Sequence, residues 1–189
     1  MKQKGFTLVE ILITLTVLGI LLMGVVGMAS SFVINAKLRS TVDEFKTGLS
    51  TAKIEAIKRN ASIIFTPNSD GGWEIAIASS FTTSGSIEKL QSKAMSSSNL
   101  TVTAVDGAGT TLTTATSKFR FTGSGRPSSD TSTEVPTPPQ YPITFKFTAT
   151  GKTCGSDSGI TCLNVTLTSG GQLKTCNPEA ASTSIYGCS

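Results

Sequence analysis

The sequence contains no histidine and few charged residues, with Asp, Glu, Lys and Arg making up 15% of its 189 residues. Histidine is the most frequent general base in enzymes and the most frequent metal ligand. The sequence also contains no nucleophile–base arrangement and no phosphate-binding loop. These absences argue against a hydrolase and against a transition-metal site, so we expect a protein that is not an enzyme and has no cofactor.

Positive charge is also scarce. The formal net charge is +4, but Lys2 and Lys4 belong to the first five residues. Without them, 14 basic side chains face 12 acidic ones, which leaves +2. So small an excess is not typical of a nucleic-acid-binding protein.

Cysteine is missing from the first 153 residues, and four cysteines then follow at Cys154, Cys162, Cys176 and Cys188. An even, clustered set indicates two disulfides formed in an oxidising compartment. A zinc site is the alternative, but it lacks both a CxxC pair and a histidine. Four cysteines allow three connectivities. We favour Cys154–Cys162 and Cys176–Cys188, because each closes a short loop that contains Gly or Ser.

The amino-terminal region carries a long apolar run, Ile11–Ile34, behind a short basic segment. A cleavable signal peptide is a poor interpretation, since the run is too long and no A-x-A site closes it. Its 24 residues, at about 1.5 Å each, suffice to span a hydrocarbon core of about 30 Å. Lys2 and Lys4 predict a cytoplasmic amino terminus, with the rest of the chain outside.

One carboxylate, Glu10, stands at the start of this apolar segment. An ionised carboxylate in lipid costs a few kcal/mol, so such residues face a partner rather than acyl chains. A positive group close to Glu10 would neutralise it in these low-dielectric surroundings.

The surrounding residues "KGFTLVE" resemble the class III signal of type IV pilins and of type II secretion pseudopilins. The resemblance implies that a prepilin peptidase cuts between Gly5 and Phe6 and methylates the new terminus, so that Glu10 becomes the fifth mature residue. Glu10 is then expected to pair with the amino group of Phe6, its own or a neighbouring subunit's, and to set the axial register during filament assembly.

The helix is expected to continue beyond the membrane. Its apolar residues recur at spacings of four and three, which is one face of a helix; they are Leu38, Val42, Phe45, Leu49, Ala52 and Ala56. Asn60 is a plausible end, so the pattern predicts one helix over about residues 7–60. The stripe is interpreted as core packing that holds a sheet.

Beyond residue 60 the pattern predicts short strands. They cover residues 62–67, 73–78, 100–105, 117–122, 143–149, 162–168 and 171–176. Alternation in the fifth segment places Ile143, Phe145 and Phe147 on one face, toward the helix. Within residues 82–98, "SIEKLQSKAM" fits a short helix or an irregular loop. The Pro-, Ser- and Thr-rich residues 124–142 are expected to form a long exposed loop.

These elements predict an α+β architecture, a long amino-terminal helix packed on a small antiparallel sheet. With the resemblance, this is the type IV pilin fold. The expected organisation is a leader over residues 1–5, a transmembrane and assembly half-helix over 6–34, and a periplasmic globular domain over 35–189. The expected location is the inner membrane before incorporation into an extracellular pilus.

Three later segments resemble the GspH/FimT-type minor pilins. They are "LSTAKIEAIKRNASI" at the helix end, "FRFTGSGRPS", and "VTLTSGGQLKTCNP". The resemblance implies a minor pilin that helps prime or cap a type IV pilus. Its partners would be other major and minor pilins, the prepilin peptidase and the inner membrane.

Two alternatives stay open. The first is a minor pseudopilin of a type II secretion system. The second is a DNA-binding minor pilin for natural transformation, with Lys174 and Arg126 as candidate DNA contacts. Some family members carry Gly-Arg-x-Arg in the last motif, where this chain has Gly171, Gln172, Leu173 and Lys174. Lysine contacts a phosphate only as a point charge, whereas arginine binds it bidentately, so this site is weakened.

Overall fold

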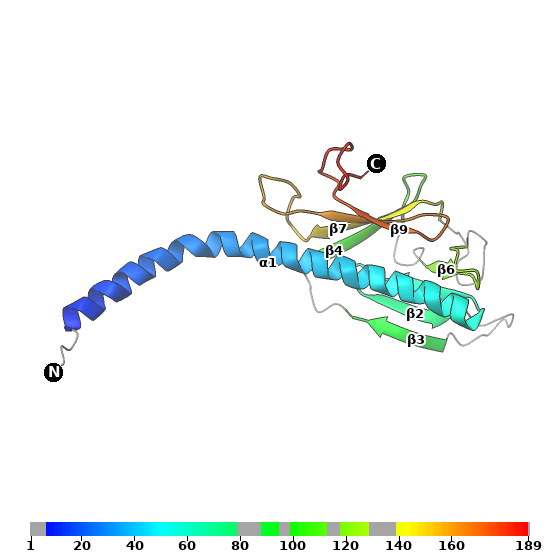
Figure 1. The fold of residues 1–189 in the computed structure, drawn as a ribbon, viewed down its shortest axis with the longest axis horizontal. Coiled ribbons are helices and arrows are strands. Elements are labelled where there is room, and N and C mark those ends of the chain that lie inside the picture. The colour runs from blue at the N-terminus through cyan, green and yellow to red at the C-terminus, as the bar shows by residue number, and fades with distance from the viewer. Residues whose placement is uncertain (1–6, 79–87, 95–98, 113–117, 129–138, 189) are drawn as a thin grey trace.

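The structure is a computed structural model that describes residues 7–78, 88–94, 99–112, 118–128 and 139–188, apart from the side chains of residues 22–29. Within these described residues, one long helix comes first and nine strands follow it. Figure 1 shows the second half of the helix lying along the strands, while the first half extends beyond them on its own.

The helix α1 (Leu8–Arg59) has a capping residue at each end. Thr7 precedes it in an extended conformation, and its side chain accepts a hydrogen bond from the backbone N–H of Glu10. Asn60 follows it at φ 47° and ψ 41°, and its backbone N–H bonds to the carbonyls of Ala56 and Ile57. Asparagine tolerates this left-handed conformation better than most residues. The predicted span of 7–60 is confirmed.

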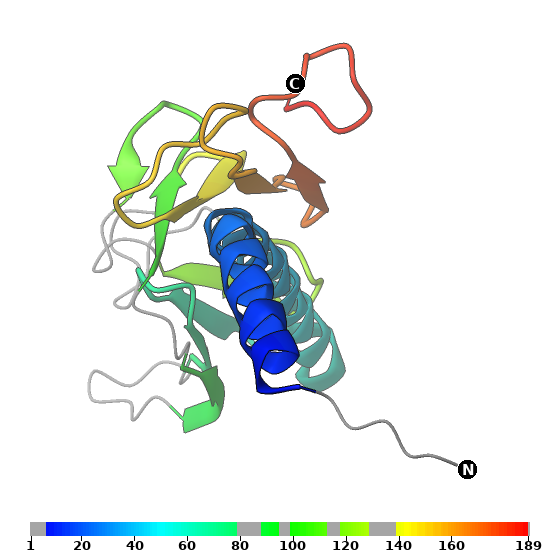
Figure 2. The ribbon, with the colours of Figure 1, turned by 90° about the vertical axis from the view of Figure 1, so that its left-hand side faces the viewer.

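The strands form two antiparallel sheets, where the sequence predicted a single small one. The first has the order β3 (Glu88–Lys93), β2 (Trp73–Ile77), β1 (Ile63–Pro67) and β6 (Phe119–Phe121). The second has the order β5 (Thr111–Leu112), β4 (Leu100–Val105), β7 (Ile143–Ala149), β8 (Leu163–Leu167) and β9 (Leu173–Cys176). Figure 2 shows α1 between them, with one sheet on each side. The predicted α+β architecture, a long helix packed on antiparallel strands, is confirmed, and the strands divide into two sheets, with β6 returning to β1 after the chain has entered the second sheet.

The core forms where the predicted stripe of α1 meets both sheets. Leu38, Phe45 and Leu49 are 0% exposed, and the rest of the stripe is buried as well. The ring of Phe45 lies 5.3 Å from that of Phe65 in β1 and 4.9 Å from that of Phe145 in β7. Phe45 therefore joins the two sheets. Ile143, Phe145 and Phe147 are buried on the helix side, as their alternation predicted.

Two local predictions were wrong. The segment "SIEKLQSKAM" contains strand β3, which pairs antiparallel with β2 through a register shift at Ile75/Ala76. Its helix-forming composition is overridden by this pairing. The described ends of the expected exposed loop, 124–128 and 139–142, include buried residues: Gly125, Pro127, Ser128 and Pro139. Pro127 forms a bridge with Phe121, which draws the loop end onto the sheet. The short strand β5 was missed.

The structure contains the two disulfides that the loop lengths favoured. Cys154 is bonded to Cys162, with Cα atoms 5.6 Å apart, and Cys176 to Cys188, with Cα atoms 5.0 Å apart. The first closes a loop before β8, and the second closes the loop that follows β9. The polypeptide after β9 is thereby tied back to the end of that strand.

Candidate assembly site

The first turns of α1 carry the acidic residue singled out in the sequence. Glu10 is exposed, and its backbone N–H bonds to Thr7 Oγ1 at 3.3 Å and to Thr7 O at 3.1 Å. A carboxylate in the first turn interacts favourably with the positive end of the helix dipole. Gly5 and Phe6, the predicted processing residues, lie outside the described part of the chain.

The side chains around Glu10 are apolar and uncovered. Every described side chain from Leu8 to Leu21 is exposed, with Leu8 at 80% and Ile20 at 71%. Soluble monomers rarely present so long an apolar surface, and its presence marks a protein or membrane contact. Among the described residues, no helical stretch combines the length and the apolar character needed to cross a membrane.

The polar hydroxyls in this half-helix are satisfied by the helix itself. Thr14 and Thr16 donate their Oγ1 hydrogens to the carbonyls of Ile11 and Ile13, each at 2.8 Å. A hydroxyl bonded to its own backbone needs no further partner. Glu10 is thus the charged side chain on the apolar surface from Leu8 to Leu21, where the hydroxyls of Thr14 and Thr16 are already bonded within the helix.

The globular domain meets α1 at Asn35. The Asn35 side chain donates to the carbonyl of Gly159 at 2.8 Å and accepts from the backbone N–H of Thr161 at 2.9 Å. Both partners lie in the loop closed by Cys154–Cys162. Sequence reasoning missed this contact, although an amide at the end of an apolar run was a usable signal. The stapled loop therefore holds α1 where its buried half begins.

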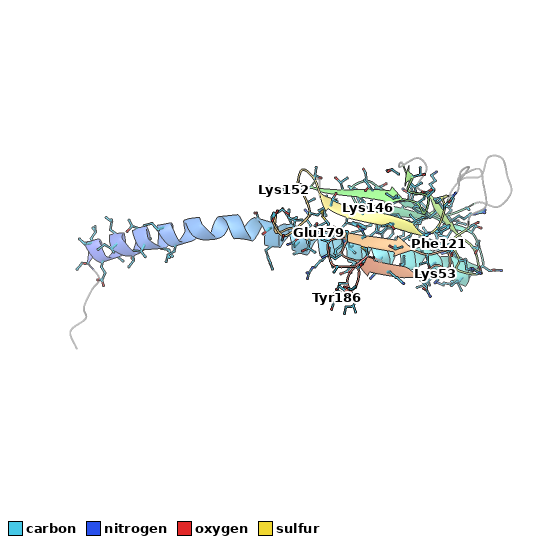
Figure 3. The ribbon with its side chains drawn as sticks, turned by 90° about the horizontal axis from the view of Figure 1, so that it is seen from above. Lys53, Phe121, Lys146, Lys152, Glu179 and Tyr186 are labelled. Atoms are coloured by element: carbon cyan, nitrogen blue, oxygen red, sulfur yellow. A yellow bond between two sulfur atoms is a disulfide. The ribbon has the colours of Figure 1, made fainter. Side chains whose placement is uncertain are left out.

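The candidate DNA contacts, Arg126 and Lys174, are both exposed. The turns that precede them touch: a Cβ on Gly171 would lie 2.9 Å from the Gly125 carbonyl oxygen. Lys53 Nζ donates to the Gly171 carbonyl at 3.1 Å, so this cation ties the helix end to the turn between β8 and β9. Figure 3 labels Lys53 beside the strands. The structure brings the two turns together, and the basic side chains themselves project to solvent.

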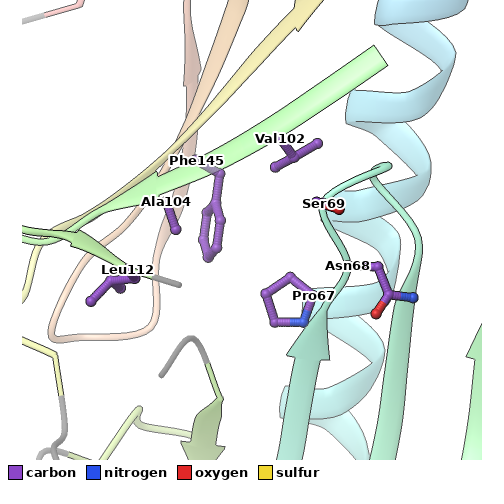
Figure 4. A pocket seen from close by; sticks show the side chains of 7 residues that line it. All are labelled: Pro67, Asn68, Ser69, Val102, Ala104, Leu112 and Phe145. Carbon is purple, nitrogen blue, oxygen red and sulfur yellow. The ribbon is translucent and has the colours of Figure 1, made fainter. Parts of the chain in front are cut away.

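The hollow between the two sheets does not suit a substrate. A cavity of about 30 Å³ lies between the end of β1 and the strands β4 and β7, with Pro67 and Phe145 on its two sides (Figure 4). That volume holds a water molecule or two. In the described part of the chain, no cluster of three His, Cys, Asp or Glu residues offers a metal site.

Two family descriptions match the chain. The prokaryotic N-terminal methylation motif matches residues 1–26. The type II transport protein GspH matches residues 41–182. The comparison with curated proteins gives no match.

Solved structures of two minor subunits are similar in fold. The type IV minor pilin FimU of Pseudomonas aeruginosa is 18% identical, with a TM-score of 0.50 over 82% of this chain and 99% of FimU. The minor pseudopilin EpsH of the type II secretion system of Vibrio cholerae is 14% identical, with a TM-score of 0.48 over 76% of this chain and 96% of EpsH. The likeness to FimU agrees with the type IV pilin fold, a long helix packed on antiparallel strands. With the match over residues 41–182 covering most of its 189 residues, the chain belongs to the family of the type II transport protein GspH.

Proposed function

We propose that this chain is a minor pilin that helps prime or cap a type IV pilus. The observation that carries the proposal is the contrast within α1, where an apolar, uncovered half-helix bears a lone carboxylate and the other half is buried in a folded domain. In a subunit of this form, the apolar half-helix can pack against other subunits in a filament, and the folded domain stays separate from that contact. The methylation motif over residues 1–26 and the fold shared with FimU support the proposal.

Processing is the first step of the proposed function. A prepilin peptidase would cut between Gly5 and Phe6, leaving a free amino group four residues before Glu10. Residues 6–34 would then hold the subunit in the inner membrane as a single span, with residues 35–189 in the periplasm. Lys2 and Lys4 support this orientation, because positive residues stay on the cytoplasmic side.

Glu10 would supply the assembly step. Its carboxylate would pair with the amino group of Phe6 in the neighbouring subunit, so both charges would leave water together. The exposed leucine, isoleucine and valine side chains on either side of it would pack against other helices. We expect Glu10→Ala to leave the protein in the membrane and to stop its incorporation.

A second function, that of a minor pseudopilin in a type II secretion system, is favoured by the family description itself. Both machines need the same helix, so the geometry does not separate them. Deletion of the gene, with parallel assays of twitching, protein secretion and DNA uptake, tests the proposal. Loss of twitching with normal secretion is expected, and loss of secretion alone would assign the chain to the secretion system.

DNA binding is tested separately. With a charge excess of +2 outside the first five residues, we expect no gel shift of duplex DNA by the full chain in detergent, even at low salt, where phosphate contacts are strongest. A shift that Lys174→Gln and Arg126→Gln abolish would establish the DNA-binding alternative instead.

A further inference from the structure

The two disulfides differ in how they are built into the domain. In the first bridge, Cys162 is 2% exposed and belongs to the core, and Cys154 packs against that core. In the second bridge, Cys176 and Cys188 are half-buried and lie outside the core. Buried structural disulfides resist reduction, whereas more exposed ones are exchanged more readily. The second bridge is therefore the better candidate for chemistry with an external thiol.

The loops that the two bridges close are also held differently. In the loop after β9, the hydrogen bonds join residues of the loop itself: Asn177 N–H donates to the Tyr186 carbonyl, and Ser184 N–H to the Ala181 carbonyl, each at 2.7 Å. The loop of the first bridge is bonded instead to Asn35 of α1. Opening the second bridge would therefore release its loop and leave the hold on α1 unchanged.

A buried amide donates to one sulfur of the second bridge. Asn164 in β8 is 8% exposed, and its Nδ2 donates to Cys188 Sγ at 3.7 Å. Hydrogen bonds to an ionised acceptor are about twice as strong as those to a neutral one. The bond from Asn164 therefore strengthens when Cys188 becomes a thiolate, which favours cleavage that leaves the charge on this sulfur.

Positive charge lies on the same face of the second sheet. Lys146 in β7 is directly opposite Asn164, which is directly opposite Cys176 in β9. Residues opposite each other share one face of a sheet, and so does Lys174, two positions before Cys176. Both lysines are exposed. Among the described residues, neither lysine has a carboxylate within ion-pair distance.

The loop of the second bridge contains one carboxylate, Glu179. Its Oε1 lies 3.8 Å from the position of a Cβ on Gly155, so Glu179 contacts the loop of the first bridge. Figure 3 labels Lys146 on β7 and Glu179 on the loop that follows β9. Reactive cysteines are partly exposed and have cations near them, and the second bridge combines these features with a hydrogen-bond donor to sulfur.

We infer that Cys176–Cys188 is a thiol–disulfide exchange site for an external thiol, with Cys188 as the leaving sulfur. The incoming thiolate attacks Cys176 Sγ and forms a mixed disulfide there. The bond between the two cysteine sulfurs breaks, and its electron pair leaves on Cys188 as a thiolate that accepts from Asn164. The second thiolate of a dithiol then displaces Cys176, so the protein gains two electrons and the dithiol becomes a disulfide.

Exchange changes what the domain presents to solvent. Ile185 and Tyr186 are 89% and 69% exposed, and the closed loop holds them in place through the bond from Asn177 to the Tyr186 carbonyl. Opening the bridge frees this apolar pair. The chemistry belongs to the single chain and does not depend on a filament.

The test equilibrates the full chain in detergent micelles with graded ratios of reduced to oxidised dithiothreitol, followed by rapid alkylation with N-ethylmaleimide. Trypsin separates the bridges, because residues 153–174 carry Cys154 and Cys162 and residues 175–189 carry Cys176 and Cys188. Mass spectrometry then measures the alkylated fraction of each peptide. We expect the second bridge to open at a ratio at least tenfold lower than the first. Equal midpoints, or the reverse order, would overturn the inference.

A monothiol identifies the leaving sulfur. With glutathione, we expect the mixed disulfide on Cys176 and a free thiol at Cys188, which peptide fragmentation distinguishes. Glutathione found mainly on Cys188 would overturn the assignment. In the reduced protein, Cys188 should react with iodoacetamide at a lower pH than Cys154, because Asn164 and the two lysines stabilise its thiolate. Reaction of both cysteines at the same pH would contradict that role.

Substitutions separate activation of the sulfur from simple support of the loop. Asn164→Leu removes the donor at similar size and should raise the midpoint ratio of the second bridge at least fivefold. Lys146→Gln should raise it severalfold at low salt and less at high salt. Lys152→Gln, an exposed lysine before the first bridge, is the control and should change it less than twofold. If Asn164 only held the loop, Asn164→Leu would make the bridge easier to open.

The test stays decisive if a variant does not fold. Circular dichroism shows whether Asn164→Leu is folded. The order in which the bridges open and the position of glutathione are measured on the wild-type chain, so both outcomes stand without the variant. Neither measurement involves incorporation into a filament, so its result is independent of the outcome for Glu10→Ala.

Discussion

The two halves of α1 have similar apolar residues and opposite surroundings. Leu8 and Ile20 are 80% and 71% exposed, whereas Leu38 and Leu49 are 0% exposed. Both halves belong to one continuous helix, which has a capping residue at each end. The difference lies in what covers them: among the described side chains, those from Leu38 onward pack against the two sheets, whereas those from Leu8 to Leu21 are all exposed (Figures 1 and 2).

The comparison indicates that the second half of α1 serves folding and that the first half is available for assembly. The second half contributes its apolar side chains to the stability of a single chain. The described side chains from Leu8 to Leu21 contribute nothing to that core, and their apolar surface is available to other molecules. Substitutions should therefore change either unfolding or incorporation, according to the half in which they fall.

The largest expected effect on stability comes from Phe45, which joins both sheets. Phe45→Ala should lower the free energy of unfolding by about 3–5 kcal/mol, because it leaves a cavity in a closed core. Leu12→Ala, in the exposed half, should change it by less than about 0.5 kcal/mol. Urea unfolding in detergent measures both, and equal losses would contradict the division of the helix.

The next largest loss of stability is expected when the loop closed by Cys154–Cys162 is opened. Replacing Cys154 and Cys162 by serine should cost about 2–3 kcal/mol, the usual scale for a short disulfide loop. The same urea titration measures it, with chemically reduced wild-type protein as a comparison. A loss below about 0.5 kcal/mol would show that the Asn35 contacts alone hold the loop on α1.

A smaller effect is expected at Asn35 itself. Asn35→Ala removes both hydrogen bonds to the loop and should cost about 1–3 kcal/mol. Asn35→Asp keeps the acceptor for Thr161 N–H and loses the donor to Gly159, so an intermediate loss is expected. Wild-type stability of the alanine variant would mean that the loop is held elsewhere.

The smallest effect concerns alkaline pH. Burial raises the pKa of Tyr141 to about 12, against an ordinary value of about 10 in the unfolded chain. Between these values the unfolded state releases the proton more readily, so stability should fall as the pH rises from about 10 to about 12. Tyr141→Phe should remove this part of the pH dependence. An unchanged slope of unfolding free energy against pH would assign the loss to other groups.

Much of the fold could be predicted because the spacing of apolar residues shows locally which face of a helix or strand is buried. The spacing of Leu38, Val42, Phe45 and Leu49 marks the buried face of the helix, and the alternation at Ile143–Phe147 marks the inner face of β7. Division into two sheets was not predictable, since alternation shows which face is buried and not which strands pair. Strand β3 was missed for the same reason: its only described partner is β2, and its own residues are nearly all exposed.

The candidate site was predictable only in part. Glu10 and the cysteines stand out by residue type and position. The Asn35 contacts join residues 124 and 126 positions apart, which no local pattern links. The partner proposed for Glu10, an amino group of a neighbouring subunit, lies outside a single folded chain, so this pairing stays a prediction.

The most direct measurement of the central claim is incorporation of Glu10→Ala into filaments, compared with Leu12→Ala as the matched variant from the same half-helix. Membrane and sheared-filament fractions are assayed for both variants by immunoblot. The account predicts that both proteins reach the membrane and that only Leu12→Ala enters the filament. Normal incorporation of Glu10→Ala would contradict the role proposed for this carboxylate.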